Sequence, residues 1–222
     1  MDTVYAFVRQ FGDVQSEDIY VSEDEFEDVG GLTLIYRKDH IHTWLDISYY
    51  VSEDGGLEQL TLHASASEEK DADLPWEAGV IPLYDETIPQ QFSYYSLPSI
   101  LTNYGMPDQA FLVVGRDIID RPYEWQPMIL TIYYAEKNFF LEYEFTRYSQ
   151  GDQYYGCPHR SHIRVSAGEA GSPPYEWFQE LLTSGYALEN VTSVTLEEFY
   201  SIFTVPDNTA CVYTPMSLWP PQ

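Results

Sequence analysis

Phe139-Phe140-Leu141-Glu142-Tyr143-Glu144-Phe145-Thr146 is the stretch that decides the fold class. Its odd-numbered positions are apolar or aromatic, and from Glu142 onward its even-numbered positions are polar. Successive side chains of a β-strand point to opposite faces, so this period of two gives the strand one apolar and one polar face. The stretch therefore predicts an antiparallel sheet with one face in the core and the other face in solvent.

The segments before this strand continue the pattern. The apolar run 128–134 predicts a partner strand, joined to 139–146 by a turn at 136–138. Residues 96–104 read as a short helix, with Pro98 in its first turn and Gly105 just after its end, and residues 110–114 read as the strand that follows.

The N-terminal third reads as a meander of antiparallel strands. Apolar and β-branched runs at 4–8, 32–36, 41–50 and 57–63 are separated by Gly-rich and acidic turns. Residues 65–92 are acidic and carry three prolines, so we expect a long loop there.

The fold class we predict is α+β, an antiparallel, meander-rich sheet with a few short helices, mostly in the C-terminal half. We expect a single domain over 1–222, with 1–64 (β-meander) and 93–222 (α+β) as candidate subdivisions joined by the loop 65–92. After the hairpin we expect a strand at 162–165, a helix at 173–182 and a last helix that ends at 203. A capping box, Thr195-Leu196-Glu197-Glu198, begins that last helix.

The chain is strongly acidic. It has 36 acidic and 10 basic residues, a net charge of −26, and 44% hydrophobic residues. The hydrophobic fraction excludes a disordered chain, and the charge disfavours direct binding to nucleic acid or to anionic lipid. No apolar run approaches the roughly 18 residues of a membrane span, so we expect none.

The chain has two cysteines, Cys157 and Cys211. We favour a disulfide between them, which would contribute about 4 kcal/mol by closing a long loop. The alternative is two buried thiols in a cytosolic protein. The disulfide implies an extracytoplasmic location (periplasmic, cell-surface or secreted), and the sequence given shows no export signal at its start.

One segment resembles a known group of proteins. It reads Leu97-Pro98-x-x-Leu101-x-x-Tyr104-Gly105-x-Pro107-Asp108, and it is similar to a segment of uncharacterised exported or lipid-anchored bacterial proteins. The tail is also similar, with Phe199-Tyr200, Cys211, Thr214-Pro215 and Trp219-Pro220. The resemblance covers 93–222 and implies an extracytoplasmic α+β domain, but no catalytic residue. The sequence departs from the group in lacking the signal and the lipidated cysteine.

Two groups of side chains have the composition of chemical sites. Cys157, His159 and His162 have the spacing of zinc or copper ligands, although a disulfide would remove the Cys157 thiolate. Glu142 and Glu144 lie on the same predicted strand face and are candidates for the carboxylate pair of a glycosidase. For both groups we favour a structural role, a disulfide cysteine near two surface histidines and two acidic residues on a solvated strand face. We therefore predict no catalytic residue, no metal and no cofactor.

The preferred function is a non-enzymatic exported accessory or structural protein that acts through surface contacts. The 20 tyrosines and 5 tryptophans are suited to binding a protein or glycan surface. The alternatives are a carbohydrate-binding or glycoside-cleaving protein, an acidic DNA-mimic inhibitor of a basic protein, and a subunit of an extracellular filament or layer. Whether the protein is an enzyme stays open, with a non-enzymatic role favoured because no catalytic motif is present.

Overall fold

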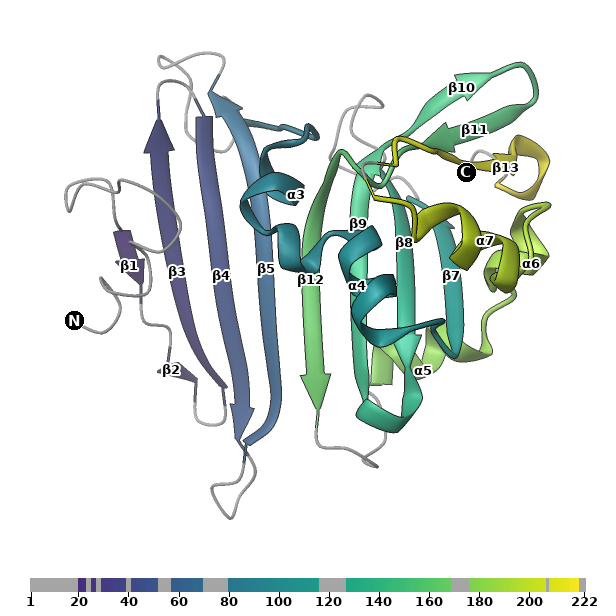
Figure 1. Cartoon of the computed structure of the whole chain (residues 1–222). Coiled ribbons are helices and arrows are strands. Elements are labelled where there is room, and N and C mark those ends of the chain that lie inside the picture. Colours follow the sequence, from purple (N-terminus) through teal and green to yellow (C-terminus); the bar gives the residue numbers. More distant parts are fainter. Residues whose placement is uncertain are drawn as a thin grey trace. The chain divides into compact units, whose positions relative to one another are not determined.

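The computed structural model describes residues 20–22, 25–26, 29–38, 41–51, 57–69, 80–115, 127–168, 176–206 and 208–219. The chain divides into two compact units, Met1–Leu83 and Tyr84–Gln222. The fold is α+β, with antiparallel sheets and short helices that belong to the second unit (Figure 1). The predicted fold class is therefore confirmed.

The first unit is an antiparallel meander. Its strands are β1 (Tyr20–Ser22), β2 (Glu25–Phe26), β3 (Val29–Lys38), β4 (Ile41–Val51), β5 (Leu57–Glu69) and β6 (Val80–Pro82). Strand β4 pairs with β3 and β5, with Leu45 opposite Leu34 and Ile47 opposite Leu62. The strands expected at 32–36, 41–50 and 57–63 are thus confirmed, whereas the one expected at 4–8 lies outside the described residues.

The interval 65–92 differs from the loop we expected. Strand β5 continues to Glu69, β6 occupies 80–82, and a helix, α3, spans Thr87–Gln91; residues 70–79 lie outside the described part. We expected a loop from the acidic residues and prolines of this interval, but local composition does not show which residues are buried by pairing in the sheet. Ala64 and Ala66 have low strand propensity, yet they are fully buried in the sheet, where a small side chain fits.

The second unit is built around four antiparallel strands in the order β12–β9–β8–β7. Their bounds are β7 (Gln109–Val114), β8 (Pro127–Tyr134), β9 (Phe139–Thr146) and β12 (Ser161–Gly168). The predicted hairpin is confirmed, because β8 and β9 pair along their whole length around the short 3-10 turn η5 (Ala135–Lys137). Asn138 closes this turn in the left-handed conformation, with φ 43°.

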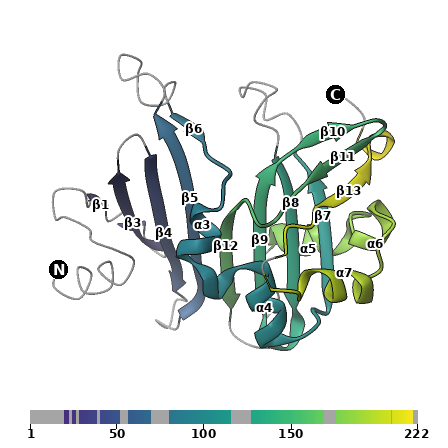
Figure 2. The same cartoon turned by 45° about the horizontal axis from the view of Figure 1, so that its top comes forward.

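Helices cover both faces of this sheet (Figure 2). Helices α4 (Leu97–Tyr104) and α7 (Leu196–Phe203) lie over one face, where the Tyr143 hydroxyl donates to the Tyr95 carbonyl oxygen at 2.9 Å. Helix α5 (Glu176–Thr183) lies over the other, where the Phe178 ring stacks on Phe140 with centroids 4.7 Å apart. The side of β9 that carries Phe140 and Glu142 is therefore buried, and the prediction of a solvent-facing side is wrong at these two positions.

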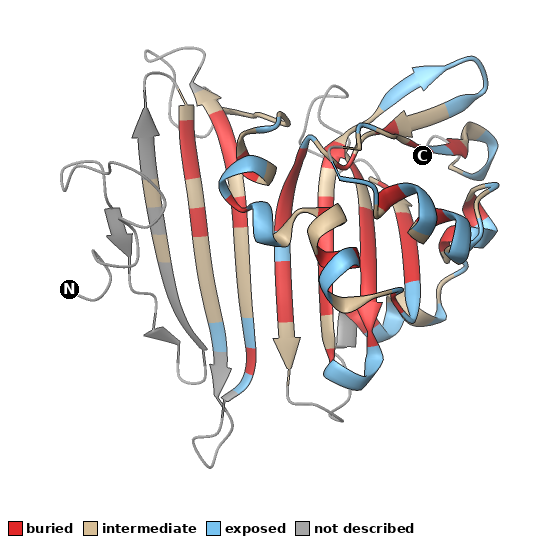
Figure 3. Cartoon of the chain, viewed as in Figure 1, coloured by how far each residue is buried: buried red, intermediate tan, exposed pale blue. Residues whose placement is uncertain are grey.

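Burial follows from this arrangement (Figure 3). Leu112, Leu130, Ile132 and Leu141 are 0% exposed, so the sheet centre forms the core of the second unit. On the opposite side of β9, Phe140 is 2% exposed under α5 and Glu142 is 9% exposed. The sequence pattern of alternating aromatics and acids did not indicate a second covering helix.

Two of the predicted helices begin and end as expected. Helix α4 has Ser96 at its N-cap and Gly105, with φ 83°, at its C-cap, although the Ser96 hydroxyl donates to the Ser93 carbonyl instead of capping an amide. Helix α7 begins with the predicted capping box, in which Thr195 and Glu198 bond to each other's backbone N–H.

A second, three-stranded sheet completes the second unit. Its order is β10 (Tyr148–Gln150), β11 (Gln153–Gly156) and β13 (Val212–Pro215), and the sequence pattern did not predict it. The remaining short elements are η3 (Ser93–Tyr95), α6 (Leu188–Val191) and η6 (Met216–Leu218). Among the described residues, no helix combines the length and apolarity needed to cross a membrane.

Candidate ligand-binding groove

The second unit contains a groove with a volume of about 590 Å³. Three chain segments line it: α3 to α4, the loop 158–161 after Cys157, and the residues from the end of α7 to Thr209. Its lining residues are Glu86, Pro89, Gln90, Ser93, Ser96, Leu97, Pro98, Ser99, Thr102, Asn103, Pro158, His159, Ser161, Phe203, Pro206, Asn208 and Thr209. The volume is that of a site for a drug-sized ligand.

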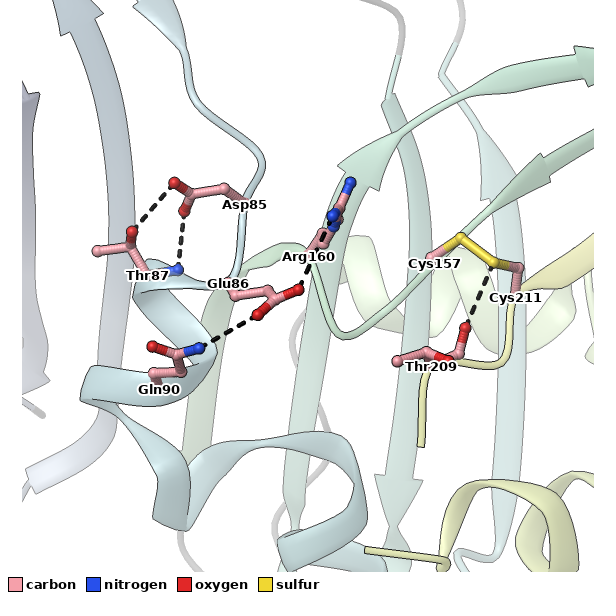
Figure 4. Close-up of polar contacts among 8 residues, drawn as sticks. All are labelled: Asp85, Glu86, Thr87, Gln90, Cys157, Arg160, Thr209 and Cys211. Atoms are coloured by element: carbon pink, nitrogen blue, oxygen red, sulfur yellow. Dashed lines mark hydrogen bonds and ion pairs between the residues drawn. A yellow bond between two sulfur atoms is a disulfide. The ribbon is translucent and has the colours of Figure 1, made fainter. Parts of the chain in front are cut away.

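The first wall is shaped by local hydrogen bonds. Asp85 accepts from the Thr87 backbone N–H at 2.8 Å and from the Thr87 hydroxyl at 3.0 Å, which fixes the start of α3 (Figure 4). The Ser96 hydroxyl lies 2.9 Å from that of Ser99 in the first turn of α4. These contacts fix the first turn of each helix, and both helices contribute residues to this side of the groove.

The second wall depends on the disulfide. Cys157 and Cys211 lie within bonding distance, with an S–S length of 1.94 Å, as we predicted (Figure 4). The loop after Cys157 turns tightly, because Arg160 N–H donates to the Cys157 carbonyl at 3.0 Å. This turn places Pro158 and His159 in the groove lining, while the disulfide ties the loop to the segment that carries Thr209.

An ion pair links these two walls. Arg160 Nη2 lies 3.8 Å from Glu86 Oε1, and Gln90 Nε2 donates to Glu86 Oε2 at 3.2 Å (Figure 4). Both charged side chains are about half exposed, so the pair adds little stability. It does offset the charge of Glu86, the single carboxylate among the described residues of the lining.

Several polar groups of the lining are not used by the protein itself. His159 Nδ1 is buried and has no hydrogen-bond partner among the described residues. The side chain of Asn103 and the hydroxyl of Thr209 likewise make no hydrogen bond within the described part of the chain. A buried polar atom is normally paired, so His159 Nδ1 is available to a ligand. Asn103 and Thr209 are exposed, and their side chains are open to a ligand as well.

The charge state of His159 follows from its surroundings. Burial lowers the pKa of the His159 imidazole, the nearby Arg160 guanidinium lowers it further, and Glu86 opposes them. The ring is therefore neutral at pH 7, where one nitrogen accepts and the other donates a hydrogen bond. With Glu86 engaged by Arg160, the groove presents uncharged donors and acceptors beside apolar proline, leucine and phenylalanine surfaces.

The two candidate glutamates lie outside this groove. Glu142 is paired with Arg164 across β9 and β12, Nη1 to Oε2 at 3.2 Å, and burial raises the pKa of its carboxyl although Arg164 lowers it. Glu144 accepts a hydrogen bond from the Tyr84 hydroxyl. Both carboxylates are held by neighbouring side chains, and neither is a lining residue. Catalysis by this pair stays a prediction.

The three metal-ligand candidates have different places in the structure. Cys157 is in the disulfide, His159 lines the groove, and His162 is a buried residue of β12 whose ring lies 4.4 Å from that of Tyr84. Within the described ranges, no three or more His, Cys, Asp or Glu side chains gather closely enough to hold a metal ion. The spacing in sequence does not bring these three residues to one site.

The sequence reasoning missed the groove because its walls come from distant segments. Residues 86–103, 158–161 and 203–209 meet only in the folded unit. One local signal was present: serines and prolines recur at 89–99, where short helices leave hydroxyl groups on their surface.

No protein-family model matches the chain, and neither a curated protein nor a solved structure matches it significantly.

Proposed function

We propose that this protein is an extracytoplasmic, non-catalytic binding protein that takes a neutral saccharide in its groove. The observation that carries the proposal is the lining, in which uncharged hydroxyl, amide and imidazole groups without internal partners stand beside apolar surfaces. Sugars offer the same combination, with hydroxyl groups around the ring and C–H groups on its faces. The disulfide supports the extracytoplasmic location.

The electrostatics favour a neutral ligand over a charged one. The net charge of −26 repels anionic ligands such as phosphates and uronic acids. A cationic ligand needs carboxylates, and Glu86 is already paired with Arg160. A neutral polyol faces neither obstacle, and it hydrogen-bonds to the groups that the groove leaves free.

The same lining supports binding without catalysis. Most glycosidases need two carboxyl groups flanking the scissile bond. Among the described residues of the lining only Glu86 has one. We therefore infer an accessory protein that binds a glycan in this groove and does not cleave it.

Isothermal titration calorimetry of the full chain tests the proposal. The probes are neutral trisaccharides (cellotriose, maltotriose and chitotriose), with trigalacturonate and trilysine as charged comparators. We expect at least one neutral probe to bind. Thr209→Val and Asn103→Ala should each weaken binding by about fivefold, the effect of losing a hydrogen bond worth roughly 1 kcal/mol.

Matched controls exist elsewhere in the second unit. Ser201→Ala on α7 and Asn190→Ala on α6 remove the same groups from exposed helix positions outside the lining. They should leave affinity unchanged. The proposal is wrong if no neutral probe binds, or if the groove variants bind as tightly as these controls.

A further inference from the structure

One face of the three-stranded sheet carries a row of tyrosines. Tyr148, Tyr155 and Tyr213 are directly opposite one another on β10, β11 and β13. Their rings are stacked, with centroids 5.2 Å apart between Tyr148 and Tyr155 and 5.4 Å apart between Tyr155 and Tyr213. Tyr148 is 43% and Tyr213 42% exposed, so the row is open to solvent at both ends.

The neighbours of this row are uncharged. Two residues along each strand, the register places Gln150, Gln153 and Pro215 on the same side. Together with the tyrosines they form what we call the tyrosine face. Both glutamines are exposed. In a chain with 36 acidic residues, a solvent-exposed sheet face built only from tyrosine, glutamine and proline is not a solubilising surface.

The tyrosine face is rigidly supported from behind. On the opposite side of β13, Thr214 is fully buried, its hydroxyl donates to the Val191 carbonyl at 2.6 Å, and Trp219 Nε1 donates to its oxygen at 2.8 Å. The Cys157–Cys211 disulfide joins the chain just beyond the paired ends of β11 and β13. Side chains held in this way lose little entropy when a ligand binds.

We propose that the tyrosine face binds a neutral polysaccharide chain that lies across the three strands. The stack covers the ring faces of Tyr155, so the apolar C–H face of a sugar ring packs on the outer ring face of Tyr148 or Tyr213 at an end of the row. The amide groups of Gln150 and Gln153 each provide donors and an acceptor for adjacent hydroxyl groups. The three phenol hydroxyls make no hydrogen bond within the described part of the chain, so they too are available.

The charge of the protein favours a neutral polysaccharide over a second copy of the chain, a nucleic acid or an acidic polysaccharide. A second copy of the chain would bring another 26 negative charges to the contact, and nucleic acids or acidic polysaccharides are also repelled. A neutral polysaccharide meets no such cost. The site is separate from the groove, since none of its six residues is a lining residue there.

Co-sedimentation of the full chain with insoluble neutral polysaccharides tests this proposal. The probes are cellulose, granular starch and chitin, with calcium pectate as the acidic comparator. We expect retention on at least one neutral probe and none on pectate. Tyr148→Ala and Tyr213→Ala should each weaken retention about fivefold, and Tyr213→Phe, which keeps the ring, should retain most of it.

The control is Tyr94→Ala, which removes a tyrosine that is 53% exposed and outside both sites. It should bind as the wild type does. Unfolding midpoints show whether each variant is folded. If Tyr213→Ala is destabilised, Tyr148→Ala still tests the proposal, because Tyr148 lies on β10 and its loss leaves the β11–β13 pair intact. Thr209→Val and Asn103→Ala, which test the groove, should leave retention unchanged.

Three outcomes would overturn the proposal. They are failure to bind every neutral probe, retention of the tyrosine variants equal to that of Tyr94→Ala, and a self-associated species that the tyrosine variants dissociate.

Discussion

Gly156, the last residue of β11, lies directly against the Phe145 ring at the end of β9. A methyl group at position 156 would overlap that ring and lie 2.9 Å from the Thr146 carbonyl oxygen. Phe145 is 1% exposed, so its ring has no space to move into. The absence of a side chain at Gly156 therefore lets the three-stranded sheet approach the larger sheet of the second unit.

This contact predicts a strong effect of a single methyl group. Gly156→Ala should lower the free energy of unfolding by about 1–3 kcal/mol, the usual cost of overpacking a core. Gly185→Ala is the matched control, because a methyl group there meets no atom within 4 Å. Chemical denaturation measures both, and equal stability of the two variants would contradict this account of the packing.

The disulfide predicts a larger change. Cys157 and Cys211 are 54 residues apart in sequence, and closing a loop of that length stabilises a folded chain by about 4 kcal/mol in the chain-entropy description. Urea unfolding of the double variant Cys157→Ser/Cys211→Ser should show a loss of this order. The wild type in a strong reductant should show the same loss, and unchanged stability in both experiments would mean that the cysteines are not joined.

The buried Glu142 predicts a pH dependence of stability. Burial raises the pKa of its carboxyl, with Arg164 only partly compensating, so the folded protein holds this proton more tightly than the unfolded chain does. Between the unfolded value of about 4.3 and the raised value, stability therefore falls as pH rises.

Replacing the carboxyl by an amide removes this contribution. The stability of Glu142→Gln relative to the wild type should increase as pH rises through that window and stay constant above it. Unfolding free energies measured from pH 4 to pH 8 check the trend. Glu136→Gln, at an exposed position of η5, should follow the wild type at every pH. A parallel course of Glu142→Gln would show that its proton is bound equally in both states.

The sequence predicted the elements whose signals are local. The alternation at 139–146 identified β9, and Pro98 with Gly105 identified both ends of α4. It did not predict features that depend on packing between residues far apart in the chain. The even-numbered side of β9 reads as a solvent face, because nothing in that strand indicates that Phe178 of a distant helix will stack on Phe140.

The two proposed binding sites were missed for related reasons. The tyrosine face needs β13 to pair with β11, a contact between residues about 60 positions apart, and its strands have three or four residues each. Gly151, with φ 63°, was a turn signal between β10 and β11 that indicates this hairpin. For the groove the local signal is limited to the serines and prolines at 89–99, because its walls are three segments joined by a disulfide and an ion pair.

The surroundings of His159 predict opposite effects of two neutral substitutions. Burial and Arg160 lower the pKa of its imidazole, whereas Glu86 raises it. Arg160→Gln should therefore raise the pKa of His159, and Glu86→Gln should lower it further. NMR titration of the histidine ring resonances measures both shifts.

The pKa of His159 in the wild type should lie below about 6.5, the value for an unfolded chain, so His159 makes folding less favourable as pH falls through 6.5. His159→Ala should reduce this loss of stability on acidification. Shifts of the same sign in the two charge variants would show that the ion pair across the groove does not set the charge state of His159.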